Sequence, residues 1–177
     1  FGRGSSGIAG RVISGWQLSG IVSLQDGQPF NVSAQAPTAV TNLGYTFGPN
    51  VVANFSGPVI EGGPDHYFNP QAFAFPACNW GSAATAIPCE LGNVGKNTLV
   101  GPAYFKTDLG MTKNMRLTEQ WNLQFRGEVF NLTNHPNFAT PASSVFTNTG
   151  SLNTAAGQIT GTISTSRQVQ FGLKLQF

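Results

Sequence analysis

Strict alternation of apolar and polar residues at the end of the sequence is the strongest constraint on how this chain folds. The odd-numbered residues of this stretch are apolar: Val169, Phe171, Leu173, Leu175 and Phe177. The residues between them are glutamine, glycine or lysine. A period of two places the two sets on opposite faces of a β-strand, so residues 167–177 are predicted to form a strand with one wholly apolar face.

The amino-acid composition indicates the environment, water or membrane, in which such a strand would be stable. Only 9% of the 177 residues are charged, whereas a typical soluble domain has about 25%. The sequence nevertheless lacks the run of about 18 apolar residues that a membrane-crossing helix needs, and its mean hydropathy is −0.06. Low charge without a long apolar run is expected of an outer-membrane protein that crosses the bilayer with β-strands.

Three earlier stretches repeat the alternation, over residues 16–33, 104–117 and 120–132. Asp26-Gly27-Gln28-Pro29 interrupts the first of them, which we interpret as one long strand with a kink. A hairpin at Asp26-Gly27 is the alternative, because Asp-Gly is a strong turn signal. Two long segments, residues 34–103 and 135–166, and one very short turn connect the predicted strands. Long loops on one side and short turns on the other are typical of outer-membrane barrels.

The sequence therefore predicts an all-β fold, an antiparallel transmembrane β-barrel fragment of about four strands with two long irregular extracellular loops. The apolar face is expected to contact lipid through Leu109, Met111, Leu123, Phe125, Val169, Phe171, Leu173 and Leu175. The opposite face is expected to point into the lumen, with the charged residues Lys106, Asp108, Arg126 and Glu128. Trp16, Trp121 and Phe177 are expected at one rim, where aromatic residues form the interfacial girdle.

The short turn must keep these faces aligned. Apolar residues are odd-numbered in both flanking strands, so odd must pair with odd and the turn must contain three or five residues. One such register places Asp108 opposite Arg126 and Lys106 opposite Glu128. Opposite charges in those positions stabilise a strand pair by roughly 0.2–1 kcal/mol.

Cys78 and Cys89 are the only cysteines, and they bracket ten small or turn-forming residues. A disulfide closing this loop is expected in an oxidising compartment, and two free thiols are the alternative. A metal site is less favoured, because no histidine or further cysteine lies close in the sequence.

The sequence predicts no catalytic set, no cofactor and no metal, so the chain is not expected to be an enzyme. Asp65-His66 is better explained as a solvent-exposed loop dipeptide than as an acid–base or metal pair. Arg126 and Glu128 are interpreted as a structural ion pair in the lumen and not as a functional pair in a cleft. The net charge of +2 comes from scattered residues, so no nucleic-acid partner is expected.

Several motifs are recognisable once the strands are placed. They are Gly15-Trp16-Gln17-Leu18-Ser19-Gly20 followed by Asp26-Gly27-Gln28-Pro29-Phe30, Tyr67-Phe68-Asn69-Pro70-Gln71-Ala72-Phe73, and Gly92-Asn93-Val94-Gly95-Lys96-Asn97 with Gly101-Pro102. The most specific is Phe125-Arg126-Gly127-Glu128-Val129-Phe130-Asn131-Leu132-Thr133-Asn134-His135-Pro136-Asn137-Phe138. From about Gly15 onward, the chain resembles the late barrel strands of Oar-like TonB-dependent receptors.

The resemblance implies a bacterial outer-membrane barrel of about twenty-two strands around a plug domain. It also implies import of a large or scarce ligand, driven by the inner-membrane TonB complex acting through that plug. Residues 1–177 would supply the C-terminal part of the barrel domain, without the plug, the energy-coupling box or a signal sequence. The implied partners are outer-membrane lipid, the rest of the barrel and its plug, and the barrel-assembly machinery, whose signal the terminal Phe177 resembles.

Two alternatives from other classes stay open. A soluble β-sandwich adhesin or carbohydrate-binding module would also use alternating strands, but it would bury the apolar face against a second sheet. A non-transporting outer-membrane barrel would have the same wall without a plug. In the loops, Tyr67, Phe68, Phe73 and Trp80 could contribute to ligand capture, although packing of the loop against itself is favoured.

Overall fold

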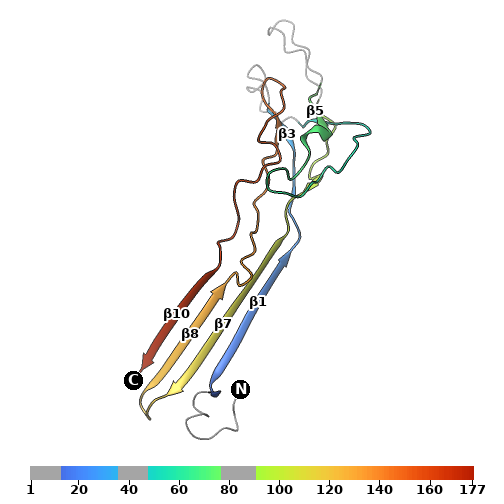
Figure 1. The fold of residues 1–177 in the computed structure, drawn as a ribbon. Helices are drawn as coiled ribbons and strands as arrows, with labels where there is room; N and C mark the ends of the chain where they lie inside the picture. The colour runs from blue at the N-terminus through green and yellow to red at the C-terminus, as the bar shows by residue number, and fades with distance from the viewer. Residues whose placement is uncertain (1–12, 36–47, 77–90) are drawn as a thin grey trace. The chain divides into compact units, whose positions relative to one another are not determined.

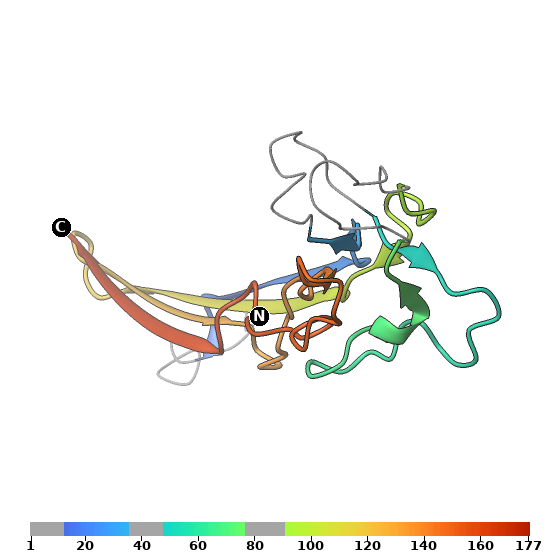
Figure 2. The ribbon, with the colours of Figure 1, turned by 90° about the horizontal axis from the view of Figure 1, so that it is seen from above.

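The computed structural model describes residues 13–35, 48–76 and 91–177, and the chain divides into two compact units. The first unit contains an antiparallel sheet with the strand order β1-β7-β8-β10. Its strands are β1 Trp16–Gln25, β7 Tyr104–Arg116, β8 Asn122–Phe130 and β10 Gln168–Gln176. They lie side by side (Figure 1), and Figure 2 shows them again as a single layer.

Strand pairing brings the alternating apolar residues of all four strands onto one face of this sheet, with only Ile21 and Phe130 on the other. Even-numbered residues of β1 pair with odd-numbered residues of β7, as in Leu18 with Met111. Odd pairs with odd between the remaining strands, as in Met115 with Leu123 and Leu123 with Leu175. Alternation within each strand then produces one continuous apolar face and one polar face. The prediction of an all-β antiparallel fold is confirmed.

The strand predicted over residues 16–33 is shorter in the structure. β1 ends at Gln25, and the chain continues through two short strands, β2 (Pro29–Phe30) and β3 (Ser33–Ala34), which pair outside the four-stranded sheet. The pattern continued past Gln25 because alternation persists in these short strands, although their partners are different. The other three observed strands of the sheet fall within their predicted ranges.

Asp26-Gly27 does not form the alternative hairpin. Instead, β2 pairs with β6 (Leu99–Val100). This pairing continues the antiparallel register of β1 with β7, whose last pair is Gln25 with Tyr104. A Cβ atom at Gly27 would lie only 1.7 Å from the carbonyl oxygen of Gly101. Glycine is therefore required here by a close approach of two backbones and not by a tight turn.

The hairpin between β7 and β8 has the predicted parity. Arg116 pairs with Asn122, which leaves the five residues Leu117–Trp121 in the turn. The Thr118 hydroxyl accepts the backbone N–H of Gln120 at 3.3 Å and that of Trp121 at 3.1 Å. The Leu117 N–H donates to the Trp121 carbonyl at 2.9 Å. The turn therefore closes around the Thr118 side chain.

The observed turn is centred on Glu119, whereas the predicted charge pairs need a turn centred on Leu117, so those pairs across the hairpin are wrong. Thr112 lies opposite Arg126, and Gly110 lies opposite Glu128. Asp108 therefore does not face Arg126, and Lys106 does not face Glu128. Parity alone could not distinguish these registers, because both keep the apolar residues on one face.

The second unit comprises Asp26–Ala103 and Phe138–Ile163 and contains short strand pairs. β3 pairs in parallel with β9 (Ser144–Phe146). β4 (Asn50–Val51) pairs with β5 (Phe73–Ala74), which follows the 3-10 helix η2 (Pro70–Ala72). Apart from β3, which begins at the end of the predicted strand 16–33, these elements lie within the ranges predicted as irregular loops. Strands of two or three residues are too short to give a periodic signal.

Aromatic side chains form the hydrophobic core of this second unit. Phe68 is completely buried, at 0% exposed, and Tyr67 and Phe73 are also buried. The Phe68 ring centroid lies 6.0 Å from that of Phe30 and 6.1 Å from that of Phe73, the latter edge-on. The favoured prediction, that these aromatics pack the loop against itself, is confirmed, whereas Trp80 lies outside the described residues.

Among the residues that the structure describes, no helix has the length and apolar character that crossing a membrane as a helix requires.

Disulfide trapping tests the observed hairpin register. In a variant with Cys78 and Cys89 replaced by serine, Arg116→Cys with Asn122→Cys should cross-link, because paired Cα atoms lie about 4.5–5.5 Å apart. The matched pair Thr112→Cys with Asn122→Cys is displaced along the strand by about 13 Å and should remain reduced. Counting free thiols by mass spectrometry after mild oxidation distinguishes the two. Cross-linking of the second pair alone would contradict the register.

Candidate functional site

The four charged residues predicted to face the lumen share the polar face of the sheet, where they form two ion pairs. The Lys106 ammonium donates to Asp108 Oδ2 at 2.8 Å, and the Arg126 guanidinium donates to Glu128 Oε1 at 2.5 Å. Each pair joins residues two apart on one strand, which therefore point to the same side. Each of these two pairs is thus neutral within its own strand and does not depend on the neighbouring strand.

Side-chain amides connect the polar face across the strands. Gln124 Nε2 donates to Asn114 Oδ1 at 2.8 Å between β7 and β8. Gln170 on β10 donates to the second carboxylate oxygen of Glu128 on β8. Residues directly opposite on paired strands are within hydrogen-bonding reach of each other. The polar face is therefore a hydrogen-bonded surface with paired charges.

Asn131, directly after β8, fastens the chain where it leaves the sheet. It is 1% exposed, and its backbone N–H donates to Asp108 Oδ1 at 2.8 Å. Its side-chain Nδ2 donates to the carbonyls of His135 and Thr165, both at 3.1 Å, and its Oδ1 accepts the His135 N–H at 3.0 Å. One buried amide thus joins three chain segments, and each of its polar atoms has a partner.

Two further asparagines extend this arrangement, and we call Asn131, Asn134 and Asn137 the asparagine brace. Asn134 Oδ1 accepts the Arg167 N–H at 3.0 Å, just before β10. Asn137, 0% exposed, accepts the Phe105 N–H at 2.7 Å and donates to Ser164 Oγ at 2.9 Å. Asn131 and Asn134 have φ values of 50° and 51°, a conformation that asparagine tolerates better than most residues.

Aromatic residues gather at the end of the sheet where β7 turns into β8. The ring centroids of Trp121 and Phe177 are 5.4 Å apart. Lys113, on the apolar face, is only 5% exposed. Its ammonium lies 4.7 Å from the Trp16 ring centroid and donates to the Ser14 carbonyl at 3.2 Å. Lys113 therefore reaches a polar partner at the strand end, as long side chains on apolar surfaces do.

The apolar face itself is open. All the residues predicted to contact lipid lie on it, as the strand registers show. Phe171 is 73% exposed and Leu173 is 71% exposed, and the Phe171 ring stacks against that of Phe125 with centroids 6.0 Å apart. Within this unit, none of the described strands forms a second layer over the face. The sheet thus presents a large apolar surface to its surroundings.

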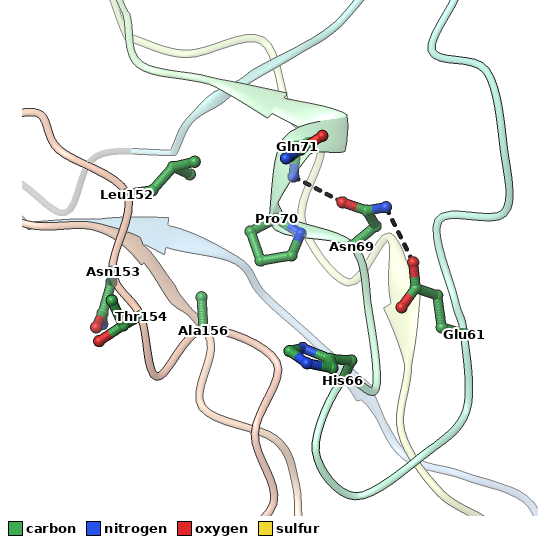
Figure 3. A pocket seen from close by; sticks show the side chains of 9 residues that line it. All are labelled: Glu61, His66, Asn69, Pro70, Gln71, Leu152, Asn153, Thr154 and Ala156. Atoms are coloured by element: carbon green, nitrogen blue, oxygen red, sulfur yellow. Dashed lines mark hydrogen bonds between the residues drawn. The ribbon is translucent and has the colours of Figure 1, made fainter.

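A pocket of about 420 Å³ lies in the second unit, between two segments distant in the sequence (Figure 3). One wall carries Glu61, His66, Asn69, Pro70 and Gln71, and the other carries Leu152, Asn153, Thr154 and Ala156. The Asn69 Oδ1 accepts the Gln71 N–H at 3.0 Å, and the Asn69 Nδ2 donates to Glu61 Oε1 at 2.9 Å. Asn69 therefore fixes both the start of η2 and the position of the Glu61 carboxylate.

Backbone hydrogen bonds hold the two walls together. The Tyr67 N–H donates to the Gly157 carbonyl at 2.8 Å, and the Ile159 N–H donates to the Pro64 carbonyl at 2.7 Å. A Cβ at Gly157, which has a φ of 81°, would lie 2.7 Å from the Phe68 carbonyl oxygen, so only glycine fits this contact. The Tyr67 hydroxyl donates to a backbone carbonyl, and burial raises the pKa of this phenol above its ordinary value of 10.0.

Metal-binding clusters are not apparent in the described ranges. No group of three or more His, Cys, Asp or Glu residues there is placed to hold a metal ion. His66 lines the pocket, whereas the His135 ring packs edge-on against Phe105 with centroids 5.6 Å apart. Cys78 and Cys89 lie outside the described residues, so their pairing stays a prediction.

The chain matches the family model for an outer membrane beta barrel domain over residues 1–170. It belongs to this family. No curated protein and no solved structure matches the chain significantly. Membership assigns the protein to the bacterial outer membrane, and it explains why the sheet of this outer-membrane barrel has one apolar and one polar face.

Sequence reasoning missed the two features that organise the loops of this barrel domain. The asparagine brace has a local signal, the spacing of three residues in Asn131-x-x-Asn134-x-x-Asn137, because asparagine side chains often replace backbone partners in turns. The pocket has no local signal. Its walls come from segments more than 70 residues apart, and only the tertiary fold places Glu61 and Thr154 in the lining of one pocket.

Removing one brace side chain should destabilise the sheet end. We expect Asn137→Ala to lower the free energy of unfolding by about 1–3 kcal/mol, because the Phe105 N–H would lose its buried acceptor. Urea unfolding in detergent, followed by tryptophan fluorescence, measures the change. The control Thr133→Ala alters an exposed residue of the same segment and should change stability by no more than about 0.5 kcal/mol. Equal effects of the two substitutions would contradict the assigned role.

Proposed function

We propose that this chain forms part of the wall of a TonB-dependent transporter that imports a large or scarce ligand across the outer membrane. The main support is the segment Phe125–Phe138, which resembles the Oar-like receptors most specifically. In the structure, this segment contains both the charge pair of β8 and the asparagine brace. The family match supports the barrel itself, and the transport role extends that finding.

The apolar face is proposed to contact lipid directly. Its central residues on β10, Phe171 and Leu173, are more than two-thirds exposed. A β-sandwich would cover such a face with a second sheet, and burial would stabilise it by roughly 25 cal/mol per Å² of apolar surface. A lipid bilayer offers the same apolar surroundings without a second protein layer. The exposure therefore favours a membrane barrel over the sandwich alternative.

The described sheet is proposed to continue into further strands. β1 and β10 are its two edges, and single-chain bacterial barrels have at least about eight strands. Strand edges leave backbone N–H and C=O groups without partners, which is not tolerated in hydrocarbon. We therefore propose that these strands are part of the wall of a larger barrel domain, with the charged residues of β7 and β8 facing a plug domain. From the resemblance, Phe177 is proposed as the assembly signal.

An arginine introduced at the centre of β10 tests which face meets lipid. Leu173→Arg should destabilise the barrel by about 2–4 kcal/mol in phospholipid vesicles, because a guanidinium would enter the hydrocarbon. Gln170→Arg is the matched control, since it places the same group on the polar face beside Glu128. Urea titrations of the two variants in vesicles measure the difference. A destabilisation by Gln170→Arg equal to that by Leu173→Arg would oppose the assignment.

Conductance distinguishes a plugged transporter from an open pore. We expect the full-length protein, purified from the outer membrane of its native host, to show little conductance in planar bilayers. Deleting the predicted plug domain should then open large channels, because a barrel of about twenty-two strands encloses a wide lumen. Open channels before any deletion would indicate a non-transporting pore. A protein that stays in the aqueous phase without detergent would indicate the soluble sandwich.

A further inference from the structure

The pocket of the second unit has the volume of a small-molecule site and opens to solvent. Its volume of about 420 Å³ falls in the range of about 300–1,000 Å³ typical of ligand pockets. Figure 3 shows its two walls facing each other, with His66 and Asn69 on one side and Asn153 and Thr154 on the other. The walls are joined by backbone hydrogen bonds, so the pocket is formed before any ligand arrives.

Several polar side chains of this pocket retain hydrogen-bonding capacity. Asn69 occupies only one oxygen of the Glu61 carboxylate, Oε1, and no described residue donates to Oε2. The side chains of His66, Gln71 and Thr154 form no hydrogen bond with the described part of the chain, and all three are exposed. Together they offer donors and acceptors from a carboxylate, an imidazole, an amide and a hydroxyl.

Charge and polarity restrict what this pocket can hold. Glu61 is the one acidic residue in the lining, which contains no lysine or arginine, so the site disfavours anions. Its apolar side chains are Pro70, Leu152 and Ala156, without a phenyl or indole ring on which a large hydrophobic ligand could stack. A ring that carries several hydroxyl groups, each both donor and acceptor, matches the polar side chains of this mixed lining. The apolar residues can contact the C–H groups of a ring.

From these features we propose that the pocket binds a neutral saccharide, with one or two sugar rings inside it. Glu61 accepts hydrogen bonds from sugar hydroxyls through Oε2, and Gln71 bonds to the same ring from η2. Thr154 and His66 contact the ligand from opposite walls. The inference builds on the proposed transport function, because it assigns a substrate class to the loop unit, but binding itself does not require energy coupling.

Isothermal titration calorimetry on the purified full-length protein in detergent tests this proposal. The probes are maltotriose, cellotriose, mannotriose and chitotriose, with trigalacturonate as the anionic counterpart of similar size. At least one neutral trisaccharide should bind with a dissociation constant below roughly 1 mM. Trigalacturonate should bind more weakly than that trisaccharide, because its carboxylates approach Glu61.

Variants of the lining link binding to this pocket. Glu61→Gln and Gln71→Ala should each weaken binding by at least about fivefold, the effect of losing one hydrogen bond worth about 1 kcal/mol. Glu119→Gln and Gln120→Ala change the same residue types in the β7–β8 turn and should leave binding unchanged. Thermal unfolding of each variant verifies that its fold is intact.

Three results would overturn the inference. They are absence of binding by every neutral trisaccharide, binding that is insensitive to both pocket variants, and tighter binding of trigalacturonate. Conductance of the same protein reports separately on the plug. If an open pore binds a saccharide, the binding proposal is supported and the transporter proposal is rejected. If a plugged barrel binds none, the transporter proposal is supported and the binding proposal is rejected.

Discussion

The structure depends on a pairing register that keeps nearly all apolar strand residues on one face of the sheet, with Ile21 and Phe130 as the exceptions. A shift of a single residue in any pair would move half of those side chains to the opposite face. The observed registers avoid this in all three pairings of the sheet, from Leu18 beside Met111 to Leu123 beside Leu175. The outer-membrane setting makes this alignment decisive, because hydrocarbon accepts the apolar face and the polar face must stay away from it.

The polar face of the sheet carries charged side chains within a barrel wall, and ion pairs compensate four of these charges. Lys106 with Asp108 and Arg126 with Glu128 pair along their own strands. Asp108 also accepts the backbone N–H of Asn131, so the ion pair of β7 is joined to the asparagine brace. The brace in turn determines where the chain leaves β8 and where it enters β10. Charge pairing and loop positioning are therefore coupled through one carboxylate.

Much of the sheet could be predicted from the sequence, because period-two alternation identifies strands, faces and the parity of pairing. The register of the β7–β8 hairpin could not be predicted, since it depends on how the Thr118 side chain closes a five-residue turn. The sequence predicts a strand that continues to residue 33, whereas β1 ends at Gln25. Alternation does not reveal this end, because it continues into β2, which pairs with β6. The pocket was not predictable, because Glu61 and Thr154 are brought together only by tertiary contacts.

Site-directed spin labelling tests the central claim that lipid contacts the apolar face of β10. Labels would be placed one at a time at residues 169–174 of the protein in lipid vesicles, after Cys78 and Cys89 are replaced by serine. We predict that labels at Val169, Phe171 and Leu173 relax faster with oxygen, which partitions into lipid. Labels at the even positions should relax faster with a water-soluble nickel chelate. Loss of this alternation, with the odd positions shielded from both reagents, would show a packed protein interior and contradict the account.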